Sequence, residues 1–152
     1  MGGGEPIDGG KKAKDGGRLL GDGKTIRGFF SGVFAALAVG ALEAIALPGT
    51  GYDIYAGSRA TYVFAGFLLG LGTMAGDLAG SYIKRRQGVA QGKPSFLMDQ
   101  LSFLLVALLF AYPVAGGIIT LESAIFLAVL TYFVHVSANV IAHRLGLKRV
   151  PW

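Results

Sequence analysis

The sequence predicts an all-α integral membrane protein, a bundle of four transmembrane helices, and three observations indicate this fold class. The 152 residues are 53% hydrophobic and only 15% charged, whereas about 25% of the residues of a typical soluble domain are charged. The mean hydropathy is +0.56, and the hydrophobic residues gather in four long runs. The positive charges lie almost entirely on one side of these runs.

Each apolar run is close to the ~20 residues that a helix needs to cross the hydrocarbon core of a bilayer. The four runs are residues 26–47, 60–83, 95–112 and 121–143. In lipid, a segment of this length satisfies its backbone hydrogen bonds only as a helix. Pro48 ends the first run, and Pro113 turns the third run into the fourth. Soluble apolar helices are the alternative, but four consecutive runs with so few charges do not favour them.

Glycine occurs in two different contexts in this chain. Nine of the 25 glycines lie in the first 23 residues, where they indicate a loop. We expect residues 1–24 to be a basic cytoplasmic segment that forms part of the site, with a flexible tail as the alternative for residues 1–16. Other glycines recur at GxxxG spacing in the first two runs, as Gly66 and Gly70 do, which predicts close packing of those two helices.

The distribution of cations predicts the orientation in the membrane. The net charge of +5 would suggest a nucleic-acid partner for a soluble protein, but 13 of the 14 lysines and arginines flank the runs on one side, and only Arg59 lies on the other. The positive-inside rule therefore predicts a multi-pass cell-membrane protein with both termini and the loop 84–94 in the cytoplasm, and no nucleic-acid partner. Residues 25–145 would form the transmembrane catalytic domain, and residues 146–152 an interface anchor ending at Trp152.

The stretch 76–103 contains the principal candidate site. It places Asp77 and Asp99 in apolar segments, on either side of a basic loop that begins at Lys84. An ionisable residue within the membrane costs at least a few kcal/mol, so it is a candidate functional residue by default. Two carboxylates with water and phosphate oxygens are typical of a Mg²⁺ site. We expect Asp77 and Asp99 to hold Mg²⁺; an ion pair of Asp77 with Lys84, or of Asp99 with Arg85, is the alternative without a metal.

Helical spacing brings further polar groups to the same layer. Asp77, Ser81 and Lys84 share one face (i, i+4, i+7), and Asp99 and Ser102 share another (i, i+3). With a rise of about 1.5 Å per residue, Asp77 lies roughly 10 Å and Asp99 roughly 6 Å inside the cytoplasmic surface. This depth indicates a pocket that opens to the cytosol.

His135 and Asn139 lie one helical turn apart in the fourth run and fall in the same layer as the two aspartates. Such a pair more often makes hydrogen bonds between helices than it catalyses, so we interpret both residues as structural.

A glycine-rich turn, residues 20–28, opens the first helix. Backbone N–H groups at such a helix start bind phosphate, and Lys24 and Arg27 would add charge-assisted contacts. Packing of the first two helices would bring both cations towards Asp77. The turn is not a P-loop, because Gly17 lies one residue too far from Gly23 for the GxxxxGK[ST] pattern.

These motifs together resemble the CTP:phosphatidate cytidylyltransferase superfamily. Its signature, a GD…S…KR segment followed by an aspartate in the next helix, matches Gly76-Asp77, Ser81, Lys84-Arg85 and Asp99. The DGKTxRG segment at 22–28, the MDQL segment at 98–101 and the closing LKRVPW at 147–152 are similar to the archaeal branch, the CDP-archaeol synthases. The resemblance covers nearly the whole chain.

The resemblance implies transfer of CMP from CTP to an unsaturated archaeal ether-lipid phosphate, 2,3-bis-O-geranylgeranylglycerol 1-phosphate, with release of pyrophosphate and a requirement for Mg²⁺. It implies that Asp77 and Asp99 hold the metal and that Lys84 is catalytic. The remaining residues expected to bind substrate are Asp22, Lys24, Thr25, Arg27, Ser81, Lys84, Arg85, Gln100 and Ser102. It also implies a fifth, N-terminal helix that the 152 residues do not include, and an acid where Ser102 stands.

Two other functions compete with this interpretation. A small cation or proton transporter would use Asp77 and Asp99, but it would need polar residues outward of them, where Phe64, Phe67 and Leu71 stand instead. A CDP-alcohol phosphotransferase shares a DGxxAR start, but Ile26 replaces the alanine and its later paired aspartates are missing. A homodimer is a further expectation.

Overall fold

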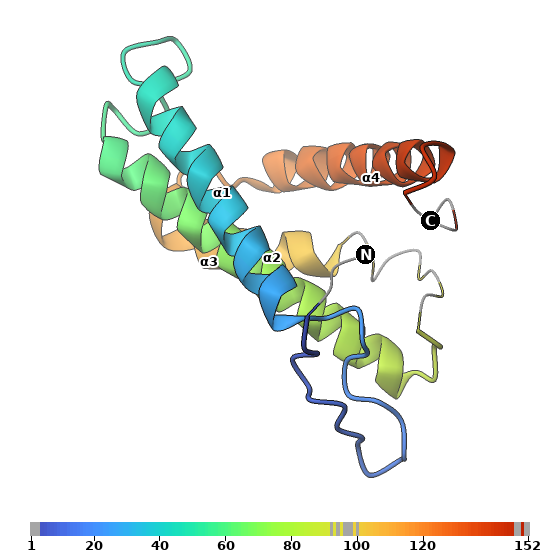
Figure 1. Cartoon of the computed structure of the whole chain (residues 1–152). Coiled ribbons are helices and arrows are strands. Elements are labelled where there is room, and N and C mark those ends of the chain that lie inside the picture. Colours follow the sequence, from blue (N-terminus) through green and yellow to red (C-terminus); the bar gives the residue numbers. More distant parts are fainter. Residues whose placement is uncertain are drawn as a thin grey trace.

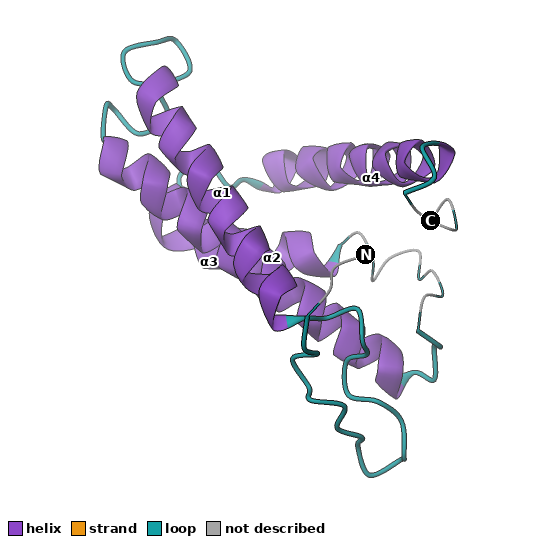
Figure 2. Ribbon diagram, in the orientation of Figure 1, coloured by secondary structure: helices purple, strands orange, loops and turns teal. Residues whose placement is uncertain are grey.

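The computed structural model describes residues 4–91, 93, 95, 99, 101–147 and 150. Over this part of the chain it contains four helices and no strand: α1 (Ile26–Ala46), α2 (Arg59–Arg86), α3 (Ser102–Ala115) and α4 (Leu121–Arg144). Figure 1 shows α1 and α2 side by side with α3 behind them, and Figure 2 shows that loops connect the helices and precede α1. The predicted all-α fold is confirmed.

Three of the described helices are long and apolar enough to cross a membrane: α1 with 21 residues, α2 with 28 and α4 with 24. The third predicted helix, 95–112, differs from the structure at both ends, because α3 has 14 residues and runs from Ser102 to Ala115. At its start, the Asp99 carboxylate accepts the Ser95 N–H at 2.7 Å and the Asp99 N–H donates to the Ser95 carbonyl at 3.1 Å, so Ser95 and Asp99 are bonded to each other twice ahead of α3. At its end, Pro113 lies inside the last turn and has no N–H to donate to the Leu109 carbonyl, and the helix ends two residues later at Ala115.

Helix α1 packs against α2 through glycines, as the GxxxG spacing predicts. A Cβ atom added at Gly66 would lie 2.8 Å from the carbonyl oxygen of Ala36 and 2.9 Å from the Cα atom of Gly40. The two backbones therefore touch at this point. Lipid provides no hydrophobic drive for helices to associate, so this close van der Waals contact is what holds the pair together.

Helix α3 packs on a second glycine face of α2. A Cβ atom at Gly72 would lie 2.7 Å from the Cα atom of Ala107, and one at Gly76 would lie 2.6 Å from the Cα atom of Phe103. Helix α2 is thus the central helix, with α1 on one face and α3 on the other. Gly76 directly precedes Asp77, so the packing of α3 against Gly76 fixes where the Asp77 carboxylate lies relative to α3.

Helix α4 stands away from the other three helices, so the structure is more open than the bundle that the sequence predicts (Figure 1). None of its residues is buried, and it approaches α3 where the rings of His135 and Phe103 lie 5.9 Å apart. The glycines of α2 that allow close backbone contact are used by α1 and α3. The layer of polar groups therefore takes its carboxylates and lysines from the N-terminal segment, α2 and the residues before α3.

We predict that Gly66→Ala destabilises the protein, because the new methyl group would overlap the backbone of α1, and overpacking of this kind typically costs about 1–3 kcal/mol. Thermal unfolding in detergent measures the effect. Gly117→Ala is the matched control, since a Cβ atom there would meet nothing within 4 Å. Equal unfolding midpoints for both variants would contradict the packing of α1 on α2.

Candidate functional site

Residues 4–25 form a folded loop against the C-terminal end of α2, which we call the N-terminal hairpin. Two isolated bridges, Pro6 with Thr25 and Lys12 with Arg18, pair its two arms. The Ile7 N–H donates to the Lys24 carbonyl at 2.8 Å. Residues 4–16, for which a flexible tail was the alternative, lie within this hairpin.

The centre of the hairpin is the buried carboxylate of Asp8. Its side chain is 1% exposed and accepts a hydrogen bond from Arg18 at 2.9 Å. It also accepts the backbone N–H groups of Leu20 at 3.0 Å, Gly10 at 3.1 Å and Gly21 at 3.3 Å. Burial alone would raise the pKa of Asp8, but the Arg18 guanidinium and these N–H groups outweigh burial and lower the pKa well below its ordinary value.

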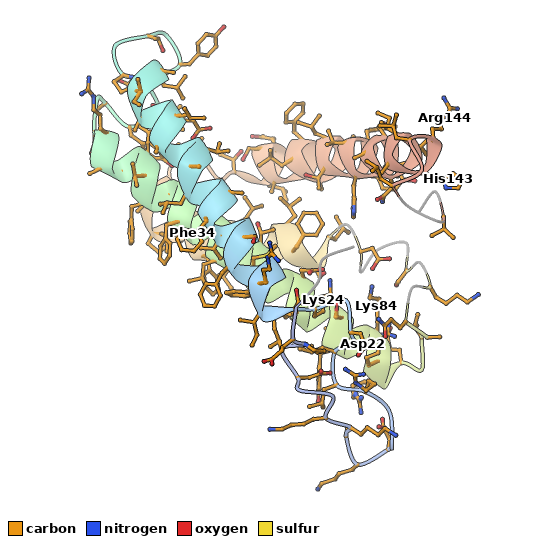
Figure 3. The ribbon with its side chains drawn as sticks, viewed as in Figure 1. Asp22, Lys24, Phe34, Lys84, His143 and Arg144 are labelled. Carbon is orange, nitrogen blue, oxygen red and sulfur yellow. The ribbon has the colours of Figure 1, made fainter. Side chains whose placement is uncertain are left out.

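The hairpin places Lys24 next to Asp77. The Lys24 Nζ atom lies 2.5 Å from Asp77 Oδ2, so the expected approach of Lys24 to Asp77 is confirmed. Next to it, Thr25 is the N-cap of α1, and its hydroxyl accepts the Gly28 N–H at 3.0 Å. Thr25 is 4% exposed, so its hydroxyl is engaged in the helix cap. Figure 3 shows Lys24 and Lys84 near each other at one end of the α1–α2 pair.

The second ion pair joins Lys84 of α2 to Asp99 in the segment before α3. Both side chains are half-buried, and the second oxygen of Asp99 accepts the Ser95 N–H. The predicted alternative pairs, Asp77 with Lys84 and Asp99 with Arg85, are not those that the structure shows. Lys24 rather than Lys84 pairs with Asp77 because the hairpin folds back onto α2, and the sequence did not predict this fold of the hairpin.

A hollow of about 170 Å³ opens beside the first ion pair, between the hairpin, α1 and α2. Its polar lining includes Lys24 and Asp77, and its apolar wall includes Phe29, Met74 and Leu78. Ser81, one turn beyond Asp77 on α2, is 4% exposed. Asp77, Ser81 and Lys84 all belong to α2, so their shared helix face is confirmed.

The donor set is compatible with Mg²⁺. Within the described residues, no three His, Cys, Asp or Glu side chains cluster as ligands. Mg²⁺ usually takes one or two carboxylates and completes its shell with water and substrate phosphates. Asp77 is 42% exposed and uses Oδ2 for Lys24, and Asp99 is 26% exposed. Both side chains are thus partly exposed, and a cation at Asp99 would share its oxygens with Lys84 and the Ser95 N–H.

The other predicted site residues differ in where they lie. Asp22 pairs with Arg18 at 2.5 Å and so belongs to the hairpin. Arg27 is exposed on the first turn of α1. The Nε atom of Arg85 is buried and has no hydrogen-bond partner in the described part of the chain.

The predicted helix face shared by Asp99 and Ser102 is wrong, because Asp99 precedes α3 and Ser102 is the first residue of that helix. The two residues are three positions apart in the sequence, but the structure does not place them together on one helix. Gln100 lies outside the described residues.

Sequence reasoning missed the residues that fold the hairpin: Asp8, Asp15, Arg18 and Arg86. Arg86, the last residue of α2, donates to Asp15 at 2.7 Å and to the Arg18 carbonyl at 2.6 Å. The one usable signal was Asp8-Gly9-Gly10, because an aspartate followed by glycine is typical of a turn whose carboxylate bonds nearby N–H groups.

Comparison with known proteins agrees with this architecture. The family model described as "CarS-like: CDP-archaeol synthase" matches residues 1–152. CDP-archaeol synthase of Thermococcus kodakarensis is 50% identical over 154 residues, covering 100% of this chain and 85% of the relative. The protein of the same name from Pyrococcus horikoshii is 47% identical over 152 residues, with the same coverages.

A solved structure described as "Structural insight into an intramembrane enzyme for archaeal membrane lipids biosynthesis" superposes with a TM-score of 0.76 at 38% identity, covering 91% of this chain and 81% of that chain. This chain has several membrane-spanning helices with a charged site at one end of them. Together with this similarity, they define a multi-pass membrane enzyme of archaeal lipid biosynthesis. The match over the whole sequence makes the assignment narrower. The chain belongs to the CDP-archaeol synthase family of membrane cytidylyltransferases, which confirms the family and the class of enzyme that the resemblance implied.

Proposed function

We propose that this enzyme transfers CMP from CTP to an unsaturated archaeal ether-lipid phosphate and depends on Mg²⁺. An oxygen of the lipid phosphate attacks the α-phosphorus of CTP, the bond to the β-phosphate breaks, and pyrophosphate leaves as the CDP-lipid forms. The observation that supports this reaction most is the family match over all 152 residues. The cations gathered around Asp77 and Asp99 are suited to two phosphate-bearing substrates.

The nucleophile needs little activation in this reaction. A lipid phosphate is already ionised near pH 7, so no strong general base is required. The task of the protein is then to align two anions and to stabilise the charge that develops on the transferred phosphoryl group. Lys24 and Lys84, which are held by aspartates, and Arg85, whose Nε has no partner in the described residues, are the side chains that would do so.

Asp77 and Asp99 are the residues that would hold Mg²⁺. A bound Mg²⁺ ion would neutralise phosphate charge and stabilise the leaving pyrophosphate. Each carboxylate forms an ion pair with a lysine. These lysines can turn to phosphate oxygens when substrate arrives, because an ammonium group bonds any nearby anionic oxygen.

The orientation that fits this reaction is cytoplasmic. CTP is a charged cytosolic metabolite, and the hairpin, Lys84 and Arg85 lie on the side that the positive-inside rule assigns to the cytoplasm. The lipid phosphate would remain at headgroup depth while its isoprenoid chains stay in the inner leaflet.

We expect Asp77→Asn and Asp99→Asn each to lower turnover on the order of 10²–10³-fold, the typical loss when one group that stabilises transition-state charge is removed. Release of pyrophosphate from CTP, Mg²⁺ and ether-lipid phosphate in detergent measures this effect. Glu43→Gln, an exposed acid near the other end of α1, is the matched control. Near-normal activity in either aspartate variant would remove that carboxylate from the mechanism.

Lys24→Ala and Arg27→Ala should each weaken the use of CTP by about 1.5–3 kcal/mol, the typical value of a hydrogen bond to a charged group. This corresponds to a loss of roughly 10- to 150-fold in kcat/KM for CTP. Arg59→Ala removes the cation on the opposite side of the membrane and should have no such effect. Unchanged kinetics in both test variants would mean that residues 20–28 only start the helix and do not bind CTP.

The orientation can be tested by labelling, because the chain has no cysteine and a single introduced thiol is unique. A water-soluble thiol reagent should label Gln87→Cys only from the cytoplasmic side and Tyr52→Cys only from the outside. Both positions are exposed. The opposite labelling pattern would contradict a site that faces the cytosol.

A further inference from the structure

We propose that Asp8 is a positioning residue for Lys24: it holds the N-terminal hairpin in the one shape that places the Lys24 ammonium against Asp77. The inference rests on the proposed role of Lys24 in binding CTP. Asp8 does not touch Asp77, Lys84 or Asp99 through any recorded hydrogen bond within the described residues, so its effect on the site would be indirect.

Asp8 ties the two arms of the hairpin together. Its Oδ1 atom accepts from Gly10 on its own arm and from the Arg18 guanidinium on the other. Its Oδ2 atom accepts from the backbone N–H groups of Leu20 and Gly21. Both oxygens are thus used, the side chain is 1% exposed, and no other group in the hairpin joins so many of its parts.

The chain from Asp8 to Lys24 is short and continuous. Gly21, which donates to Asp8, also accepts the Lys24 N–H through its carbonyl at 3.1 Å. On the other arm Ile7, the neighbour of Asp8, donates its N–H to the Lys24 carbonyl at 2.8 Å. The Lys24 backbone is therefore held from both sides by segments that Asp8 fixes.

A second contact docks the hairpin on α2. The Arg86 guanidinium donates to Asp15 and to the Arg18 carbonyl, and it lies 5.5 Å from the centre of the Tyr82 ring. The Asp15 side chain is 54% exposed, and exposed ion pairs contribute little to stability. Asp8, which is buried, should therefore matter more than Asp15 for the position of Lys24.

Asp8→Asn is the substitution that tests the role of the Asp8 carboxylate most directly. The amide keeps the size of the carboxylate, but its NH₂ group would face an N–H donor or the Arg18 guanidinium. A buried donor left without an acceptor is costly, and the Arg18 guanidinium would keep only Asp22 as its counter-charge. The hairpin would then loosen around Gly21, and Lys24 would lose its fixed position.

The test is a double-mutant cycle between Asp8→Asn and Lys24→Ala, read as kcat/KM for CTP. We expect Asp8→Asn to lower this value about tenfold or more in the wild-type background and by less than threefold when Lys24 is already alanine. A residue that served only general stability would cause the same loss in both backgrounds. Asp15→Asn, the matched control in the exposed part of the hairpin, should lose less than threefold.

Limited trypsin digestion with mass analysis provides a readout that needs no activity. The Lys24 side chain is 26% exposed in the folded hairpin, so cleavage after Lys24 should be slow in the wild type and at least tenfold faster in Asp8→Asn. If Asp8→Asn does not fold in detergent, Arg18→Lys, which replaces the guanidinium whose two NH₂ groups bond Asp22 and Asp8 by a single ammonium group, carries the same two comparisons. Equal losses in both backgrounds, or equally slow cleavage after Lys24, would overturn the proposal. A wild-type protein that releases no pyrophosphate would instead contradict the proposed function, and the digestion would still test the position of Lys24.

Discussion

The structure depends on the close contact of helix backbones along the glycines of α2. In a membrane, apolar side chains gain nothing by leaving lipid for one another, so helices associate only where they can approach closely or share polar bonds. Gly66 and Gly72 provide such contacts on two faces of α2, for α1 and α3 respectively. All the charged residues of the site are arranged around this centre: Asp77 and Lys84 project from α2 itself, Lys24 arrives from the segment before α1, and Asp99 from the segment before α3.

Opposite charges then stabilise what the glycines bring together. Each carboxylate at the membrane boundary has a lysine partner, which avoids the large cost of an isolated charge in a medium of low polarity. A lysine is a compact charge with three donors, and it can exchange one anion for another. The same pairs are therefore suited to release their lysines to phosphate and their carboxylates to a metal ion.

Much of the fold followed from the sequence, because the bilayer allows few structures. The starts and ends of α1, α2 and α4 were predicted within a few residues, since apolar length and Pro48 determine them. The limits of α3 were not predicted, because apolar length does not reveal the bond from the Ser95 N–H to the Asp99 carboxylate. The site was predicted in part: Asp77 and Lys24 do meet, but the pairing of Lys84 with Asp99 and the fold of the hairpin around Asp8 are long-range contacts without a helical period to reveal them.

The central claim is that one cytoplasmic site joins CMP to a lipid phosphate, and the fate of the CTP phosphates tests it most directly. Purified protein would be incubated with Mg²⁺, an unsaturated ether-lipid phosphate and CTP labelled in turn on the α- and γ-phosphates. The account predicts that the α-label enters the lipid fraction while the γ-label leaves as pyrophosphate, in equal amounts. An α-label that stays in water, or a γ-label that appears on the lipid, would contradict it.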